Sequence, residues 1–267
     1  MQRGGGAVRA AEALASCISI AIQKAAMYRP AKDQRIVMSL TVLAPAPSPD
    51  GHHSSIARRA MVDSQLRPND VIDPVLVSAL RDTPREPYLP AALQASAYID
   101  RALPLGNGRA LNPVLTTARL IADARVSAGQ SVLLIGGATG YAAALLTCIG
   151  AAVTAVESDA ALSELARSAL GDAAGVTLVV GPLVDGAPDG APYDALIVDG
   201  AIEILPVSLL AQLKPGARIA CGLIDGAVTR LARAVAVGGE QVVRPLPFVD
   251  LECVALPGFA PPPRFTF

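Results

Sequence analysis

The sequence is poor in aromatic residues and in histidine, and each shortage excludes a class of protein. Only 3% of the 267 residues are aromatic and none is tryptophan, whereas 52% are hydrophobic. The core must therefore be built from Ala, Val, Leu and Ile, as is typical of buried strands covered by helices. The only two histidines, His52 and His53, lie in a stretch rich in Pro, Ser and Gly. A histidine triad or histidine general base in the rest of the chain is excluded, and with it most hydrolase mechanisms.

Cysteine is also scarce, and its spacing excludes a zinc site. The four cysteines form no Cys-x-x-Cys pair and no cluster with histidine: Cys17, Cys148, Cys221 and Cys253. Wide spacing of this kind indicates separate free thiols, buried in a reducing compartment. We therefore predict no bound metal and a cytoplasmic protein.

The first 60 residues differ from the rest of the chain. They hold eight Lys and Arg against three Asp and Glu, whereas the remaining residues hold 14 against 20. An apolar run within residues 10–26 has the length of a signal peptide, but Glu12 and Lys24 fit that role poorly, and the run is too short to span a bilayer. Residues 44–55 have the composition of a linker. We predict a poorly ordered or dispensable extension over residues 1–55, and one acidic domain over 56–267 that binds neither nucleic acid nor membrane.

Helices and strands are predicted to alternate along the domain. An amphipathic helical segment follows the turn signal at residues 68–70, with apolar residues at helical spacing. Helices are then expected at residues 116–125, 141–149, 160–170 and 206–213, and strands at 132–135, 153–156, 176–180, 195–198 and 218–223. A hairpin turning at Gly238-Gly239 is expected to close the domain. Because the strands are apolar without strict alternation, we predict a Rossmann-like α/β fold, with a mostly parallel sheet between helices.

A glycine turn between the first strand of this series and the following helix is the sharpest motif. Gly136, Gly137 and Gly140 allow a ligand to approach the backbone and the start of the helix. Glu157 ends the next strand, 21 residues after Gly136. A carboxylate in that position accepts hydrogen bonds from both hydroxyls of a ribose. The pair of features predicts a site for a nucleoside cofactor, with a ligand-free strand–helix turn as the alternative.

The type of nucleoside follows from the spacing of the glycines. A dinucleotide needs a diphosphate cradle of the Gly-x-Gly-x-x-Gly kind, and Tyr141 stands at the third glycine position. S-adenosylmethionine carries no phosphate and needs only a Gly-x-x-x-Gly curve, which Gly136 and Gly140 provide. A dehydrogenase is therefore disfavoured.

Four segments in the same order resemble the protein-L-isoaspartate O-methyltransferase family: residues 61–90, 97–113, 132–146 and 193–219. The resemblance implies transfer of a methyl group from S-adenosylmethionine to an isoaspartyl carboxylate in a damaged protein or peptide. It also implies a cytoplasmic enzyme that is a monomer or a weak dimer. Carried over onto this sequence, it places the cofactor against Gly136, Gly137, Thr139, Gly140, Tyr141, Glu157 and Leu183.

The active-site loop departs from the family pattern. Leu111 stands where the family has its active-site serine, and the neighbouring Asn112 carries the nearest polar group. Asp199 follows the fourth strand, where the family has an uncharged residue. Asn112 and Asp199 are therefore the expected catalytic residues. Further departures are Leu134 in place of an acid, Ala138 in place of the middle glycine, and Gly181-Pro182-Leu183 in place of the family's adenine-contacting acid. A methyltransferase with another acceptor, or a degenerate member that acts as a binding or scaffold protein, stays open.

Overall fold

The computed structural model describes residues 49–237 and 243–260, and its centre is a seven-stranded sheet. The strand order is β5-β4-β3-β6-β7-β8-β9, with the first five parallel and β8 and β9 antiparallel. The bounds are β3 Ser131–Ile135, β4 Ala152–Glu157, β5 Val176–Val180, β6 Tyr193–Ile202, β7 Leu213–Asp225, β8 Val228–Val235 and β9 Leu246–Asp250. This confirms the predicted Rossmann-like class and its antiparallel close. The turn expected at Gly238-Gly239 lies outside the described residues.

Five of the six described α-helices begin where the sequence offers a cap or a proline. Asp73 accepts hydrogen bonds from the N–H groups of the first turn of α3, and Pro74 fills a position that needs no donor. Asp159 caps α6 in the same way. Gly150, with φ +97°, ends α5. The bounds are α2 Pro49–Met61, α3 Pro74–Asp82, α4 Val114–Ala124, α5 Tyr141–Ile149, α6 Ala160–Leu170 and α7 Val207–Leu210.

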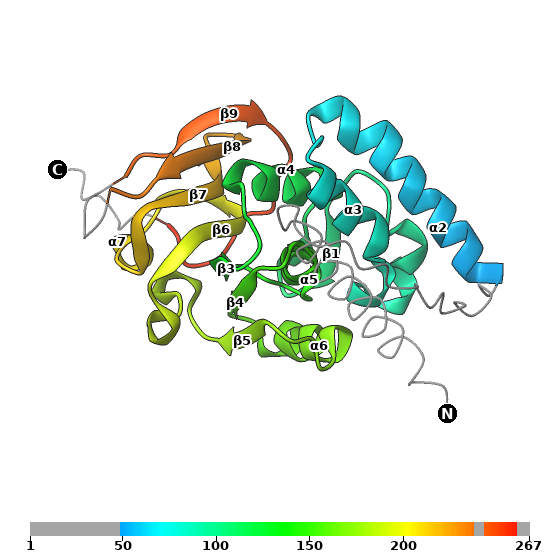
Figure 1. The fold of residues 1–267 in the computed structure, drawn as a ribbon, viewed down its shortest axis with the longest axis horizontal. Coiled ribbons are helices and arrows are strands. Elements are labelled where there is room, and N and C mark those ends of the chain that lie inside the picture. Colours follow the sequence, from blue (N-terminus) through cyan, green and yellow to red (C-terminus); the bar gives the residue numbers. More distant parts are fainter. Residues whose placement is uncertain (1–48, 238–242, 261–267) are drawn as a thin grey trace, which may run out of the picture.

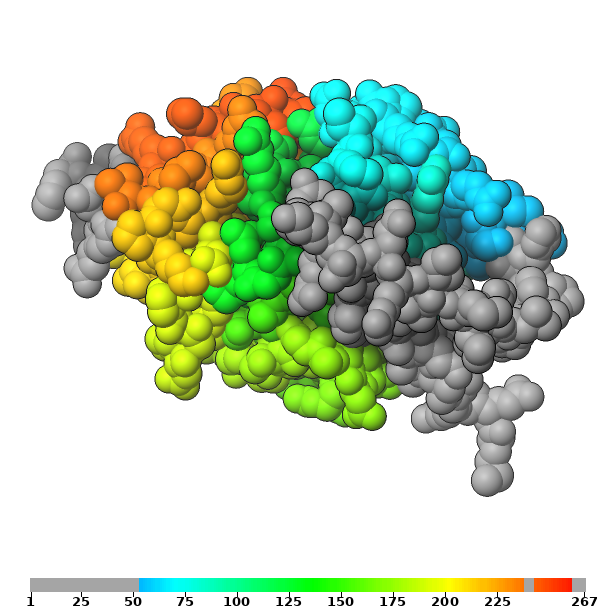
Figure 2. All heavy atoms as spheres, in the orientation of Figure 1, coloured from blue at the N-terminus to red at the C-terminus, as the bar shows by residue number. Residues whose placement is uncertain are grey.

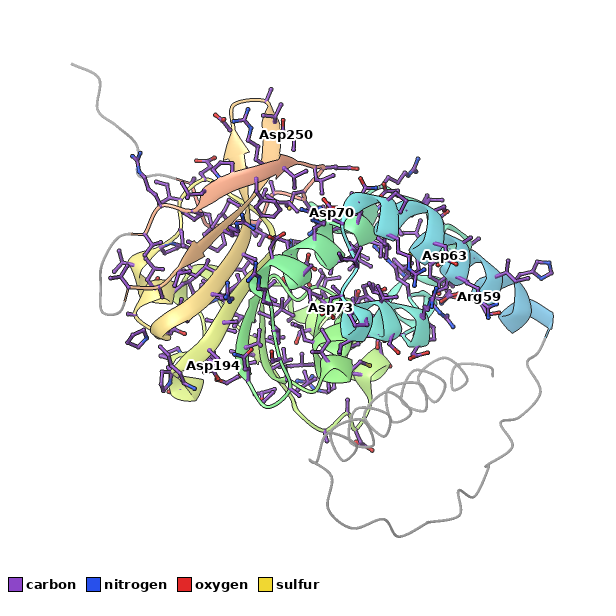
Figure 3. All side chains as sticks on the ribbon, turned by 45° about the horizontal axis from the view of Figure 1, so that its top comes forward. Arg59, Asp63, Asp70, Asp73, Asp194 and Asp250 are labelled. Carbon is purple, nitrogen blue, oxygen red and sulfur yellow. The ribbon has the colours of Figure 1, made fainter. Side chains whose placement is uncertain are left out.

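Short helical turns connect these elements. A π-helical turn, η1 Val62–Leu66, follows α2 directly, and the 3-10 turns are η2 Arg67–Asn69, η3 Glu86–Tyr88, η4 Ala91–Ser96, η5 Leu183–Asp185 and η6 Pro188–Gly190. Figure 3 shows Asp70 and Asp73 at the two ends of the connection into α3. Figures 1 and 2 place the N-terminal helices α2 and α3 at one end of the described molecule and strands β7–β9 at the other.

Two apolar clusters pack on opposite faces of the sheet. Alternate residues of β3 divide between them: Val132 and Leu134 join the cluster with α3 to α6, while Leu133 and Ile135 join the cluster with η5 and α7. The central strands are thus buried on both sides, which explains their continuous apolar sequences. Cys148, Cys221 and Cys253 lie buried, as expected, and none of them forms a disulfide among the described residues; Cys17 lies outside those residues.

Several predicted bounds were wrong. The linker expected over 44–55 is already helical from Pro49, because proline is tolerated in a first helical turn. The helix expected over 206–213 is only one turn long, since β7 begins at Leu213. Asp199, expected after the fourth strand, lies within β6 beside an irregularity between Ile197 and Ala201. The strand continues past this bulge because Ala201 and Ile202 resume pairing with β7, and Ala201 also bridges to Ala255 of the C-terminal segment.

A small hairpin escaped the prediction. Strands β1 Leu103–Gly106 and β2 Arg109–Leu111 form a separate two-stranded sheet. The Asn107-Gly108 pair at its tip is a strong hairpin signal, and both residues adopt positive φ. In the described part of the chain, no helix is both long and apolar enough to cross a bilayer.

Candidate functional site

The glycine turn lies at the carboxyl end of β3, where the sheet has its topological switch point. β3 is flanked there by β4 on one side and β6 on the other, and open α/β sheets bind ligands in such a crevice. Gly136 and Gly140 have φ of +77° and +94°. Ala138 between them also has a positive φ, +46°. The substitution of the family's middle glycine therefore keeps a left-handed backbone, at a cost of about 1–2 kcal/mol.

Protein atoms fill the space that each glycine leaves. A Cβ added at Gly136 would lie 2.8 Å from Cδ1 of Leu256, and one at Gly140 would lie 3.0 Å from Cδ1 of Leu170. The N–H groups of Gly136 and Gly137 donate to the carbonyl of Val156. The glycines are thus required by packing, whether or not a ligand binds.

Glu157, the last residue of β4, is buried beside this turn. Its Oε2 accepts a hydrogen bond from the Ala138 N–H at 2.8 Å. Its Oε1 accepts from the N–H groups of Ser158 and Asp159, at 2.9 and 3.0 Å. The carboxylate is consequently fixed at the junction of the turn and the β4–α6 connection, where the sequence placed the ribose.

An arginine that the sequence analysis did not single out also binds this carboxylate. Arg109 of β2 donates from Nη2 to Oε2 of Glu157 at 2.6 Å and from Nε to Oε1 at 3.3 Å. The side chains are 5% and 4% exposed, respectively. At the tip of the same hairpin, Asn107 donates to Asp159 Oδ2 at 3.0 Å, and this contact holds the pKa of Asp159 below its ordinary value. The guanidinium therefore occupies both carboxylate oxygens that the sequence analysis predicted for a ribose.

Thr139 and Tyr141 face protein groups on the other side of the turn. The Thr139 hydroxyl donates to the Tyr88 carbonyl at 2.6 Å. The Tyr141 ring packs edge-on against Tyr88, with ring centroids 5.6 Å apart, and the Arg85 guanidinium lies 5.1 Å from its centroid. Burial raises the pKa of Tyr141 to about 12, and its hydroxyl has no hydrogen-bond partner among the described residues.

Arg85 is fully buried, and no carboxylate of the described residues forms an ion pair with it. Its Nη2 donates to the Asn112 carbonyl, while Nε and Nη1 have no hydrogen-bond partner in the described ranges. Burial lowers its pKa, and the charge of the Asp199 carboxylate acts against this shift. Arg85 thus helps to hold the loop that carries Asn112, through its hydrogen bond to the Asn112 carbonyl.

The two expected catalytic residues are in direct contact. Asn112 Nδ2 donates to Oδ1 and to the carbonyl of Asp199, both at 2.9 Å, and Thr117 Oγ1 donates to the same Oδ1 at 3.0 Å. Burial raises the pKa of Asp199, although these hydrogen bonds oppose the shift. Asn112 Oδ1 in turn accepts from the Val254 N–H at 2.7 Å. Because both ends of this amide already bind protein, its geometry fits positioning better than contact with a substrate.

The C-terminal segment 252–256 closes this side of the crevice. Ala201 donates to the Val254 carbonyl and accepts from the Leu256 N–H, at 2.7 and 2.9 Å. Leu256 thereby packs between Gly136 and Gly200, where an added Cβ on Gly200 would lie 2.4 Å from Leu256 Cγ.

The segment after β5 contributes apolar packing. Leu183, expected to contact the cofactor, is 2% exposed and belongs to the cluster that contains α7. Asp185 is the next acid in the sequence after Gly181-Pro182-Leu183, the segment that replaces the family's adenine-contacting acid, and its side chain is exposed. Within residues 49–237 and 243–260, no group of three His, Cys, Asp or Glu side chains lies close enough to hold a metal ion.

Comparison with known proteins identifies this architecture. The model of a family described as protein-L-isoaspartate(D-aspartate) O-methyltransferase matches residues 57–238. The chain belongs to this family. A protein-L-isoaspartate O-methyltransferase 1 of Rhodopseudomonas palustris is 35% identical over 230 residues, which cover 82% of this chain and 93% of the relative. A protein-L-isoaspartate O-methyltransferase of Methylorubrum extorquens is 40% identical over 165 residues, covering 61% of this chain and 72% of the relative.

Solved structures show that the isoaspartyl methyltransferase fold extends over most of the chain. A protein-L-isoaspartate O-methyltransferase superimposes with a TM-score of 0.64 at 22% identity, covering 75% of this chain and 66% of the other. A putative family member from Plasmodium falciparum, solved with S-adenosyl-L-homocysteine, gives a TM-score of 0.61 at 14% identity, with 74% and 97% covered. Arg109 and Leu111, in the segment where the sequence departs from the family pattern, are both buried.

Proposed function

We propose that this chain is an S-adenosylmethionine-dependent methyltransferase that methylates isoaspartyl carboxylates in damaged proteins or peptides in the cytoplasm. The support is its membership of a family whose members carry that enzyme name. A solved structure of similar fold holds S-adenosyl-L-homocysteine. We expect a monomer or weak dimer without nucleic-acid or membrane partners.

The residues fit the cofactor on one condition. Glu157 is a buried acceptor beside the glycine turn, and it already receives N–H donors from Arg109 and Ala138. Two ribose hydroxyls are donors of the same kind, so they can replace the guanidinium once Arg109 has moved. The proposed binding residues are Gly136, Gly137, Thr139, Gly140, Tyr141, Glu157 and Leu183. When bound, S-adenosylmethionine supplies a methyl group on a positively charged sulfur.

The chain's own residues then have to position the acceptor and exclude water. An isoaspartyl carboxylate is ionised at neutral pH, so no general base is required. Asn112 fixes the loop before α4 against Asp199 and the C-terminal segment. Leu111, 2% exposed, keeps that loop apolar where the family has a serine. Orientation and desolvation are therefore the main contributions of this site.

The observation that carries the proposal is the buried carboxylate of Glu157 against the turn, and it can be tested by binding. Calorimetry on the full chain should show micromolar affinity for S-adenosylmethionine and S-adenosylhomocysteine, worth about −8 kcal/mol. Glu157→Ala should abolish it. Glu164→Ala, an exposed acid on α6, is the matched control and should bind as the wild type does. Unchanged affinity in Glu157→Ala would refute the ribose assignment.

A methyl-transfer assay distinguishes the alternatives. Transfer to an isoaspartyl peptide, but not to its aspartyl counterpart, is expected. Cofactor binding without transfer to the isoaspartyl peptide would point to another acceptor or, if no acceptor is found, to a silent binding protein. Folded protein that binds neither cofactor would refute the enzyme proposal as a whole.

A further inference from the structure

We propose that Arg109 sets the cofactor affinity by competing with the ribose for Glu157, so that the β1–β2 hairpin must disengage before the cofactor binds. This inference rests on the proposed function. It concerns a residue that lies outside the glycine turn and carries the opposite charge to Glu157.

The geometry of the ion pair sets Arg109 in direct competition with the ribose hydroxyls for the oxygens of Glu157. Arg109 contacts both oxygens of Glu157, at 2.6 and 3.3 Å, and neither side chain is more than 5% exposed. A guanidinium bound through two nitrogens uses the same acceptor atoms that two adjacent hydroxyls would need. The carboxylate cannot satisfy both partners in the same positions.

The hairpin has a buried base and an exposed tip. Leu103 and Leu111, which pair across its base, are 1% and 2% exposed and belong to the main core. The tip residues Asn107 and Gly108 are exposed, and the hairpin forms a sheet of its own. Release of Arg109 therefore requires movement of the tip and one side chain, while the base stays packed.

A second contact closes the same hairpin over the cofactor region. Asn107 binds Asp159, two residues after Glu157, at the cap of α6. The contacts of Arg109 with Glu157 and of Asn107 with Asp159 thus both tie the hairpin to the β4–α6 connection, where the nucleoside is proposed to bind. Opening the hairpin frees both partners together.

The movement would also reach the acceptor side of the crevice. Arg109 is three residues before Asn112, which binds Asp199 and the Val254 N–H. Cofactor binding at Glu157 is therefore coupled to the loop that positions the acceptor.

Calorimetry with S-adenosylhomocysteine tests the competition. Arg109→Gln should bind at least about tenfold more tightly than the wild type, because the closed hairpin no longer reduces the binding-competent fraction. Arg109→Lys keeps the charge but loses the two-nitrogen contact, and an intermediate affinity is expected. Arg101→Gln is the control, since it removes an exposed guanidinium just before β1, and it should match the wild type.

Hydrogen exchange gives a readout that does not depend on the variants folding. In the wild type, S-adenosylhomocysteine should accelerate amide exchange over residues 106–110 while leaving β3 unchanged. Binding without this acceleration overturns the inference. So does an Arg109→Gln protein that folds but binds no more tightly than a wild type of measurable affinity. If folded wild type and Arg109→Gln both fail to bind at millimolar concentration, the proposed function fails as well, which separates the two results.

Discussion

Breaking the buried ion pair should destabilise the cofactor-free protein strongly. Glu157→Gln leaves Arg109 buried at 5% exposure without a counter-ion. Removing one partner of a buried pair costs about 3–5 kcal/mol, because the remaining charge stays desolvated. At about 2–4 °C per kcal/mol for a domain of this size, the melting temperature should fall by roughly 6–20 °C.

A double-mutant cycle isolates the pair from other effects. Arg109→Met alone should cost a similar amount, because Glu157 loses its counter-ion. Arg109→Met with Glu157→Gln removes both charges, and the double variant should recover most of the loss. The assay is urea unfolding followed by circular dichroism at neutral pH. We expect a coupling energy of about 3 kcal/mol.

The exposed pair of Arg167 and Glu164 supplies the control. Their side chains are 56% and 72% exposed at a similar N–O distance of 2.6 Å. The same cycle there should give no more than about 0.5 kcal/mol, because solvent screens the interaction. If the Arg109 and Glu157 cycle gives a coupling no larger than this control, then the pair does not form as a buried contact, and the competition argument loses its basis.

Three further predictions concern the surroundings of the pair. Asp199→Asn should stabilise the protein at neutral pH. Burial raises the pKa of the Asp199 carboxyl, so the wild type loses stability as the pH rises from the ordinary pKa of 3.8 through the raised pKa of the folded state. The variant should therefore melt at a higher temperature than the wild type at neutral pH, and the difference between the two melting temperatures should narrow as the pH falls towards 3.8. Gly200→Ala should lower the free energy of unfolding by about 1–3 kcal/mol, because the added methyl group collides with Leu256. Adding Leu256→Ala to the same chain should relieve that collision. If urea unfolding shows that the two losses simply add, the packing of Leu256 against Gly200 is contradicted. Tyr141→Phe should leave stability unchanged or raise it by up to about 1 kcal/mol, because the buried hydroxyl of Tyr141 has no hydrogen-bond partner in the described residues. A melting temperature lowered by several degrees would show that this hydroxyl does have a partner.

The fold was readable from the sequence because its signals are local. Apolar strands without alternation, the caps at Asp73 and Asp159, and the glycine at the end of α5 each specify one element. The errors occur where long-range contacts override such signals. β6 runs on to Ile202 because its last two residues resume pairing with β7 after the bulge, and Ala201 also bridges to Ala255 of the C-terminal segment. No pattern within the strand announces either partner.

The site was predictable in its positions but not in its contacts. Spacing placed Glu157 beside the turn, and the resemblance to the family assigned Asn112 and Asp199 to one active site. The partner of Glu157 was not predictable, because Arg109 lies 48 residues away on a hairpin whose only local signal was Asn-Gly. Asn107-Gly108 forms the tip of this hairpin, and Arg109 follows the tip directly.

The glycines of the turn do not by themselves establish a ligand. A Cβ added at any of the three would lie within 3.3 Å of a neighbouring side chain: Leu256 for Gly136, Ala155 for Gly137 and Leu170 for Gly140. Packing alone is therefore sufficient to require these glycines. Glu157 is different, because burying a carboxylate is costly and packing does not require it. In the cofactor-free protein Arg109 offsets that cost, and in the bound enzyme the ribose must offset it instead. The function of this chain therefore depends on how readily one partner of Glu157 replaces the other.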